Sequence, residues 1–217
     1  MKILEGNKIK NIDCEELKNI AMSYSNTAID IGTGDGSFPY KSARKNKDSF
    51  YIGLDAVADN MIDSAVKAGK KVTKGGLNNV MYVIDNALSI PEELNNFADS
   101  IYINLPWGSL RDAVVKGEEQ LLKGIRKIAK AKATLDIYVT YSSLYEAKEI
   151  TSRQLPELSE EYINTELKYK YQSCGIKIKK VELCNNDSLK GLDTSWAKKL
   201  AFGRKREVFH FNCNFTF

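Results

Sequence analysis

The sequence has little histidine and no paired cysteines, which limits the chemistry it can carry. Its one histidine, His210, lies in the apolar stretch "VFHFNCNF", where a structural role is expected. This argues against a Ser-His-Asp triad or a histidine-rich metal site, and we expect no metal. The four cysteines are far apart and form no C-x-x-C pair, which indicates reduced, packed thiols. They are Cys14, Cys174, Cys184 and Cys213.

Long apolar runs and a leader segment are also missing. No run approaches the roughly 18 apolar residues of a membrane span, and "MKILEGNKIK" is too short and polar for a signal peptide. A chain of 217 residues with 43% hydrophobic and 28% charged residues is typical of one globular domain, 1–217. We therefore expect a cytoplasmic protein without a membrane partner.

Positive charge is concentrated in two stretches. The net charge is only +4, but lysines crowd "VKAGKKVTKGG", and "WAKKLAFGRKR" holds lysines and arginines, with acidic residues absent from both. Charge runs are often solvated surface, but clustered cations also suit a phosphate backbone. The two stretches make a nucleic-acid partner a hypothesis to weigh.

Short apolar strands alternate with helical patterns along most of the chain. This order predicts an α/β fold with a mostly parallel sheet and helices on both faces. The predicted strands lie at 27–32, 50–55, 78–85, 99–106, 133–142, 176–183 and 206–215, after a small hairpin at 3–12. The predicted helices lie at 13–24, 56–69, 118–132 and 159–175.

The loop "IDIGTGDGS" is the most informative turn. Gly32, Gly34 and Gly36 follow a strand and precede a helix, so the backbone there can turn sharply and approach a ligand. A dinucleotide loop would read G-x-G-x-x-G, but here the spacing is one residue shorter, Asp35 lies inside the loop and Asp30 lies at the end of the strand. Carboxylates repel phosphate and suit a cation, which favours S-adenosylmethionine over NAD.

Residues after the next two strands fit the same ligand. Asp55 ends the second strand, where a carboxylate can accept hydrogen bonds from both ribose hydroxyls, and 85–88 could flank the adenine. The competing interpretation is a set of ordinary turns in a nucleotide-free α/β protein. The glycine spacing is weak evidence alone and becomes specific only with both carboxylates.

Two tryptophans indicate a second ligand beside S-adenosylmethionine, a flat base. "INLPWG" ends the fourth strand, which would place Asn104 and Trp107 next to the S-adenosylmethionine site. The stretch is similar to the Asn-Pro-Pro-Tyr turn of amino-group methyltransferases. Trp196 in "DTSWAKKLAFGRKR" lies between hydroxyl and basic residues, an unusual setting for a core tryptophan. Trp107 alone could be a core residue, but together the indoles could hold a flipped base while nearby cations hold phosphates.

The motifs "DIGTGDG", "FYIG-D", "KGGL-NV", "PWG-L" and "WAK-LAFGRKR" closely resemble those of the NpmA-type aminoglycoside-resistance methyltransferases, the Kam family. These enzymes modify N1 of adenosine 1408 in 16S rRNA. The resemblance runs from "LEGNK" to "AFGRKR". It implies a Rossmann-like, S-adenosylmethionine-dependent methyltransferase fold, with a seven-stranded, mostly parallel sheet, a hairpin at 1–11 and RNA-facing insertions at 145–160 and 185–198. It also implies a monomer that acts on the 16S rRNA decoding site of the 30S subunit.

The resemblance also implies roles by position. The donor site would be formed by Asp30, Gly32, Gly34, Asp55, Ala87, Leu88, Asn104 and Ser109. The target adenine would meet Trp107, Trp196, Ser195 and Glu146. The rRNA would contact Lys67, Lys70, Lys71, Lys74, Arg153, Lys199, Arg204 and Arg206.

The sequence departs from the family pattern at a few of these positions. Leu88 stands for a Glu, Asn104-Leu105 for Leu-Phe, Ser109 for Thr and Lys199 for Arg, and one residue is missing before Trp196. Lysine cannot form the bidentate phosphate contact of arginine, and the donor contact of residue 88 is in doubt.

Adenine N1 carries an exposed lone pair once the base is flipped, so no general base is needed. Positioning of N1 would carry catalysis. Two alternatives stay open. One is an adenine-N6 or tRNA methyltransferase, which Asn104 in "NLPW" supports. The other is a non-catalytic, S-adenosylmethionine-sensing RNA-binding protein.

Overall fold

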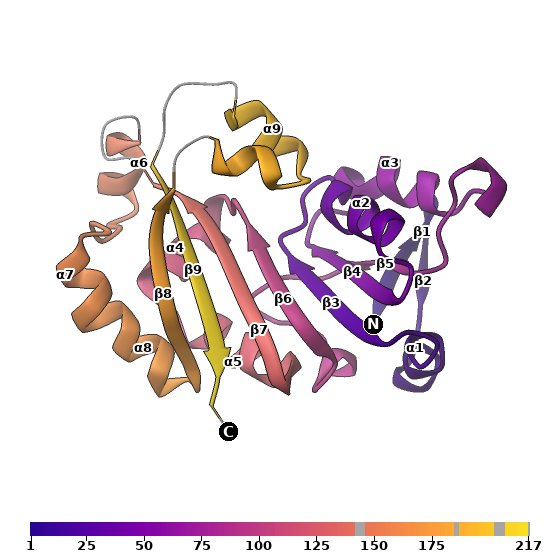
Figure 1. Ribbon diagram of the computed structural model, residues 1–217, viewed down its shortest axis with the longest axis horizontal. Helices are drawn as coiled ribbons and strands as arrows, with labels where there is room; N and C mark the ends of the chain where they lie inside the picture. Colours follow the sequence, from indigo (N-terminus) through magenta and orange to yellow (C-terminus); the bar gives the residue numbers. More distant parts are fainter. Residues whose placement is uncertain (142–145, 185–186, 202–206, 217) are drawn as a thin grey trace.

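The computed structural model describes residues 1–141, 146–184, 187–201 and 207–216 (Figure 1). Its strands are β1 (Lys2–Glu5), β2 (Lys8–Asn11), β3 (Asn26–Ile31), β4 (Ser49–Asp55), β5 (Val80–Ile84), β6 (Ala98–Asn104), β7 (Ala129–Thr140), β8 (Ile176–Cys184) and β9 (Val208–Phe215). Its helices are α1 (Cys14–Ala21), α2 (Ser37–Lys45), α3 (Ala58–Ala68), α4 (Gly108–Lys116), α5 (Glu119–Ile128), α6 (Ala147–Ser152), α7 (Glu160–Tyr162) and α8 (Lys168–Ser173). The remaining helical segments are α9 (Ser195–Ala201), the short turns η1 (Val72–Lys74), η2 (Glu92–Leu94) and η4 (Ser188–Gly191), and the π-helical turn η3 (Ile163–Leu167).

The described strands form one sheet in the order β2-β1-β5-β4-β3-β6-β7-β9-β8. Only β1 and β9 run against the other strands. The mostly parallel α/β class is therefore confirmed, but the sheet has nine strands where seven were predicted. The reason is that the N-terminal hairpin is not a separate unit: Ile3 and Leu4 of β1 pair with β5 and extend the sheet.

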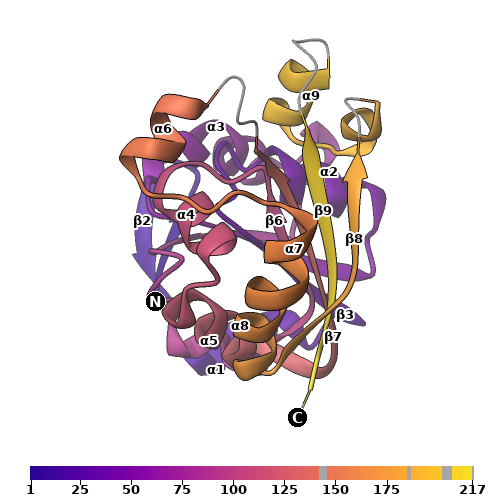
Figure 2. The same ribbon diagram turned by 90° about the vertical axis from the view of Figure 1, so that its left-hand side faces the viewer.

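Helices cover both faces of this sheet (Figures 1 and 2). The main core joins Leu17 of α1, Val114 of α4 and Ile125 of α5 to the strands. A smaller core on the other face joins Met61 of α3 to Tyr82 of β5. No helix in the described ranges is both long enough and apolar enough to cross a membrane.

The predicted helix at 118–132 is wrong at its end. Helix α5 stops at Ile128, and the "AKAKA" that follows belongs to β7. Ala129 pairs with Ala98 of β6, and Lys130 forms an ion pair with Asp99 (2.7 Å). Alanine and lysine favour a helix and are depleted in strands, so pairing with β6 overrides the local preference here.

Parallel pairing brings the carboxyl ends of three strands to one edge of the sheet. Asp30 of β3 pairs with Gly53 of β4 and Tyr102 of β6, so β3 and its two neighbours end close together. Ligands bind at such strand ends in doubly wound sheets. The polar residues of the candidate site lie there.

Candidate functional site

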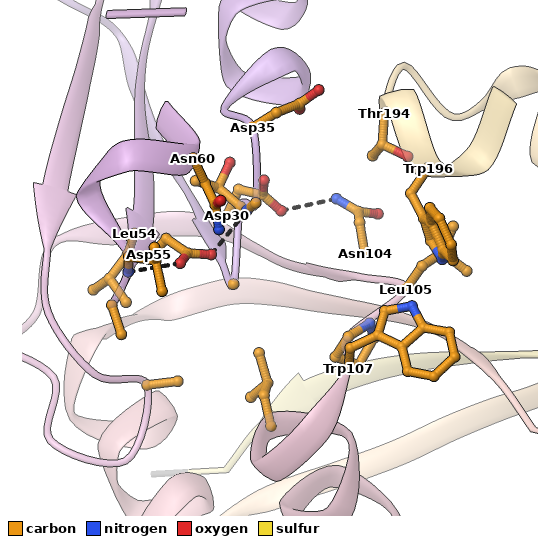
Figure 3. Close-up of a pocket in the computed structure, with 18 of the residues that line it drawn as sticks. Asp30, Asp35, Leu54, Asp55, Asn60, Asn104, Leu105, Trp107, Thr194 and Trp196 are labelled. Atoms are coloured by element: carbon orange, nitrogen blue, oxygen red, sulfur yellow. Dashed lines mark hydrogen bonds between the residues drawn. The ribbon is translucent and has the colours of Figure 1, made fainter. Parts of the chain in front are cut away.

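A cavity of about 550 Å³ opens at these strand ends (Figure 3). Its walls come from the loops after β3, β4, β5 and β6 and from the start of α9. Of the predicted site residues, it brings together Asp30, Gly32, Gly34, Asp55, Ala87, Asn104, Trp107, Ser109, Ser195, Trp196 and Lys199. The prediction missed several other lining residues, among them Thr33, Asn60, Leu105, Leu110 and Thr194.

The glycine loop needs its glycines for different reasons. Gly32, Gly34 and Gly36 have φ values of 72°, 59° and 68°, in the left-handed region. A Cβ on Gly32 would lie 2.4 Å from Leu110 Cδ2, and one on Gly36 would lie 2.5 Å from Tyr82 Cε1. A Cβ on Gly34 would meet no atom within 4 Å. Gly34 therefore leaves open space at the cavity, whereas Gly32 and Gly36 permit close packing against Leu110 and Tyr82.

Asp30 is a buried carboxyl group at the centre of the cavity. Its side chain is 2% exposed, and its Oδ1 accepts a hydrogen bond from Asn104 Nδ2 at 2.9 Å. The pKa of Asp30 is raised to about 7: burial is the largest cause, the hydrogen bond from Asn104 opposes the rise, and the charges of Asp55 and Asp35 add to it. A ligand cation placed here would favour the ionised form.

The buried Asn104 Oδ1 has no hydrogen-bond partner among the described residues. Asn104 lines the cavity, but this oxygen lies on the side of the amide away from Asp30 (Figure 3). An ammonium group in the cavity would find its acceptor in the Asp30 carboxyl group.

Asp55 holds the glycine loop against β4. Its two carboxylate oxygens accept from Gly34 N at 2.9 Å and from Val57 N at 3.0 Å. Each oxygen keeps a second lone pair for hydroxyl groups of a ligand.

Asp35 lies beside α9. Burial raises its pKa, but hydrogen bonds from Ser195 and Ser37 outweigh that effect, so the pKa is lowered and the group is ionised. Ser195 N in turn donates to Ser37 Oγ at 3.1 Å. The glycine loop is thus connected to the segment that carries Trp196.

Trp107 and Trp196 lie together at one end of the cavity (Figure 3). Their ring centroids are 5.8 Å apart and the ring planes meet at 76°, an edge-to-face contact. The side chains are 42% and 37% exposed, which is unusual for tryptophan pairs in a core. A base that stacks between two parallel indoles needs the two ring planes to be roughly 7 Å apart, twice the carbon–carbon contact distance. The predicted sandwich therefore requires one indole to turn.

Each indole is supported by its own segment. Leu105, in the turn before Trp107, has φ 55° and is buried with Ala197 and Leu200 of α9. A non-glycine residue in this region carries strain, which the packing of its side chain must offset. The segment before Trp196 is attached to α2, because Asp193 forms an ion pair with Lys45.

Glu146 does not line the cavity. It is 6% exposed, and its Oε2 lies 3.3 Å from Arg111 Nη1. The Arg111 guanidinium lies over the Trp107 ring, 5.1 Å from the centroid. Sequence reasoning missed Arg111 because α4 was not among the predicted helices. Trp107 is the extended residue directly before α4, and Arg111 lies in the first turn of that helix, four residues later.

The remaining predicted residues lie outside the cavity. Leu88 packs against the main core. The lysines at 67, 70, 71 and 74 are exposed along the end of α3 and η1. Arg153 follows α6 and pairs with Asp112 at 2.8 Å. Arg204 and Arg206 lie outside the described residues.

Comparison with known proteins gives consistent matches over nearly the whole chain. The family model for NpmA, 16S rRNA (adenine(1408)-N(1))-methyltransferase, matches residues 2–214. A 16S rRNA (adenine(1408)-N(1))-methyltransferase from Escherichia coli is 42% identical over 96% of each chain. A solved enzyme of that name from Catenulisporales acidiphilia, with its cosubstrate SAM, has a TM-score of 0.89 at 30% identity and covers 100% of this chain and 97% of its own. The aminoglycoside resistance methyltransferase NpmB1 has a TM-score of 0.87 at 31% identity over 99% of each chain.

Proposed function

The chain belongs to the family of 16S rRNA (adenine(1408)-N(1))-methyltransferases, and on that premise we propose that it transfers a methyl group from S-adenosylmethionine to N1 of adenosine 1408. The observation that carries this proposal is one cavity that joins a buried carboxyl group, Asp30, to two exposed indoles. The first suits a cationic donor and the second a flat base.

The lining residues fit the methyl donor. Asp30, held by the Asn104 amide, would receive its amino-acid ammonium group, and Asp55 its ribose hydroxyls. Ala87 would lie near its adenine, with the backbone of Leu88 behind. Ser109 would lie at the methyl-bearing end, and the glycine loop leaves space for the backbone to approach. When bound, the donor supplies a methyl group on a positively charged sulfur.

The rest of the chemistry is positioning. Trp107 and Trp196 would stack on the two faces of the adenine and hold N1 towards the donor, with Ser195 beside them. Base stacking contributes about 1–3 kcal/mol per contact. The methylated adenine is cationic, and indole faces favour a cation by roughly 0.5–2 kcal/mol. No general base is required, because N1 already carries its lone pair.

Basic residues around the cavity would bind the rRNA. Lys199 lines the cavity itself, and its Nζ lies 5.9 Å from the Trp196 ring centroid. The other proposed phosphate contacts are Lys67, Lys70, Lys71, Lys74, Arg153, Arg204 and Arg206. We propose that a monomer acts on the assembled 30S subunit in the cytoplasm, without a metal. A positive charge at N1 would repel cationic aminoglycosides at the decoding site and confer resistance.

Radiolabelled S-adenosylmethionine tests this proposal on intact 30S subunits and, separately, on naked 16S rRNA and on tRNA. The product is mapped by reverse transcription, because an N1-methyl group blocks base pairing and stops the polymerase. We expect a stop at adenosine 1408 with 30S subunits only. Incorporation without a stop would indicate N6 methylation, and incorporation only into tRNA would indicate the other alternative. Donor binding without incorporation into any RNA would indicate the non-catalytic alternative.

The structure weighs against N6 methylation in one respect. An amino-group methyltransferase would use the Asn104 side chain to hold the target amine. Here Asn104 is 8% exposed, and its amide already donates to Asp30. This arrangement suits a donor contact better than a target contact.

A further inference from the structure

A buried ionic network lies beneath Trp107. Arg111 is 1% exposed, and its Nη1 and Nη2 lie 3.3 Å from Glu146 Oε2 and 2.9 Å from Glu149 Oε2. Its guanidinium covers one face of the indole at 5.1 Å from the ring centroid. Only the opposite face of Trp107 is then left for a base.

This network connects two segments that the sequence keeps apart. Arg111 belongs to α4, directly after the Trp107 turn, whereas Glu146 and Glu149 belong to the start of α6. Burying a guanidinium is costly unless carboxylates compensate for it. Any displacement of α6 would therefore be transmitted to Arg111 and to the indole it covers.

A second ion pair extends the network to the surface. Arg153, after α6, has a 44% exposed side chain and donates from Nη1 to Asp112 Oδ2 at 2.8 Å. The other oxygen, Asp112 Oδ1, lies 3.8 Å from Arg111 Nε. Both of these atoms are buried, and neither has a hydrogen-bond partner in the described part of the chain. Asp112 thus binds the surface arginine while a buried donor lies just beyond bonding distance.

We propose that Asp112 and Arg111 are positioning residues that relay phosphate binding at Arg153 to Trp107. This inference rests on the proposed function. When an rRNA phosphate captures Arg153, its guanidinium leaves Asp112. The freed carboxylate then closes on Arg111 Nε and fixes the guanidinium under the indole. The turn of Trp107 from edge-to-face contact towards stacking is thereby linked to the arrival of RNA.

The variant Asp112→Asn tests the relay, because it keeps the shape of the side chain and removes its charge. Arg153 is then freer to meet phosphate, so 30S affinity should be unchanged or tighter. The single-turnover methylation rate at saturating 30S subunits should fall roughly tenfold, because Arg111 loses a charged hydrogen bond. Glu119→Gln is the matched control: it removes an exposed carboxylate that pairs with Lys123, and it should leave both quantities unchanged.

The Arg153→Ala background distinguishes the relay from the alternative that Asp112 only forms a surface ion pair with Arg153. In that background Asp112 is already free, so the relay predicts weaker 30S binding with a nearly normal saturated rate. Adding Asp112→Asn should then still lower the rate roughly tenfold. If Asp112 serves only to hold Arg153, its substitution will have no effect in this background, and the relay is overturned.

Arg111→Lys provides an independent measurement if Asp112→Asn does not fold. Lysine keeps the charge but lacks the planar fork that meets several carboxylates at once. The relay predicts a lower saturated rate with unchanged donor affinity by calorimetry, and an unchanged rate would overturn it. Failure of the proposed function would be recognised separately, since the wild-type protein would then give no stop at adenosine 1408.

Discussion

The two sides of the cavity differ in how firmly their side chains are held. The donor wall, formed by Asp30, Gly32, Asp55 and Asn104, is largely buried, and three of these residues are joined by hydrogen bonds to one another or to the loop backbone. The target wall, formed by Trp107 and Trp196, is more than a third exposed, and its indoles touch edge to face.

This difference indicates a division of labour. Under the proposed function, the donor wall already carries the polar groups that would bind the donor. The target wall does not yet fit its ligand, because its rings must separate and one must turn before a base can enter. We therefore infer that donor affinity is set by a preformed site and that turnover depends on a rearrangement of the indoles.

The largest expected effect concerns the donor wall and pH. The pKa of Asp30 is about 7 in the folded protein against 3.8 ordinarily, so the folded state binds the extra proton between these values. The contribution of Asp30 to stability is therefore greatest below pH 4, falls by roughly 4 kcal/mol as pH rises to about 7, and is level above it.

Urea unfolding at several pH values would measure this effect. Asp30→Asn should remove most of the slope, whereas an identical slope in both proteins would contradict the pKa. Affinity for the cationic donor should change in the opposite direction and increase as pH rises through 7, because the donor favours the carboxylate.

Next in size is the loss of either indole from the target wall. Trp107→Ala or Trp196→Ala should lower the single-turnover rate about 10- to 100-fold, because each removes one stacking contact. Donor affinity by calorimetry should not change, because the donor wall is intact. Tyr169→Ala, which removes a 72% exposed aromatic ring on α8, is the control and should change neither quantity. A comparable loss of donor affinity would show that the two walls are not independent.

The glycine loop gives a smaller, graded effect within the donor wall. Gly32→Ala places a Cβ 2.4 Å from Leu110 Cδ2 at a left-handed position, whereas Gly34→Ala is left-handed without a close contact. The left-handed conformation costs about 1–2 kcal/mol in each variant. Gly32→Ala should therefore lower thermal stability more than Gly34→Ala. Equal melting temperatures would show that Leu110 yields freely.

The smallest effect is expected at the support of Trp196. Asp193→Asn removes the ion pair with Lys45, while the bond from Lys41 Nζ to the Asp193 carbonyl oxygen (2.6 Å) remains. A partly exposed pair contributes up to about 1 kcal/mol, so turnover should fall no more than about fivefold. Asp187→Asn, in the same segment, serves as the control. A fall in donor affinity with Asp193→Asn would show that the support reaches the donor wall.

The donor wall could be predicted from the sequence because its signals are local. Asp30 and the glycines lie within seven residues, and Asp55 ends the next strand, so strand order alone brings them together. The target wall was predicted only as a set of residues. The edge-to-face contact of the indoles and the strain at Leu105 depend on packing of α9, which leaves no local signal. Arg111, the ionic partner of Glu146, was missed because α4 itself was not predicted. The nine-stranded sheet was missed because pairing of β1 with β5 requires no special residue.

The place of β9 in the sheet has a consequence for how the protein matures. β9 lies between β7 and β8, so β8 cannot join the sheet until residues later in the chain have been made. The contact of Ser195 with Ser37 spans 158 residues, and such distant contacts form slowly during folding. We expect the half of the molecule that contains β3, β4 and β5 to fold while synthesis continues. Activity would then appear only after β9 leaves the exit tunnel, because Val208 of β9 packs with Ala197 and Leu200 of α9, the helix that carries Trp196.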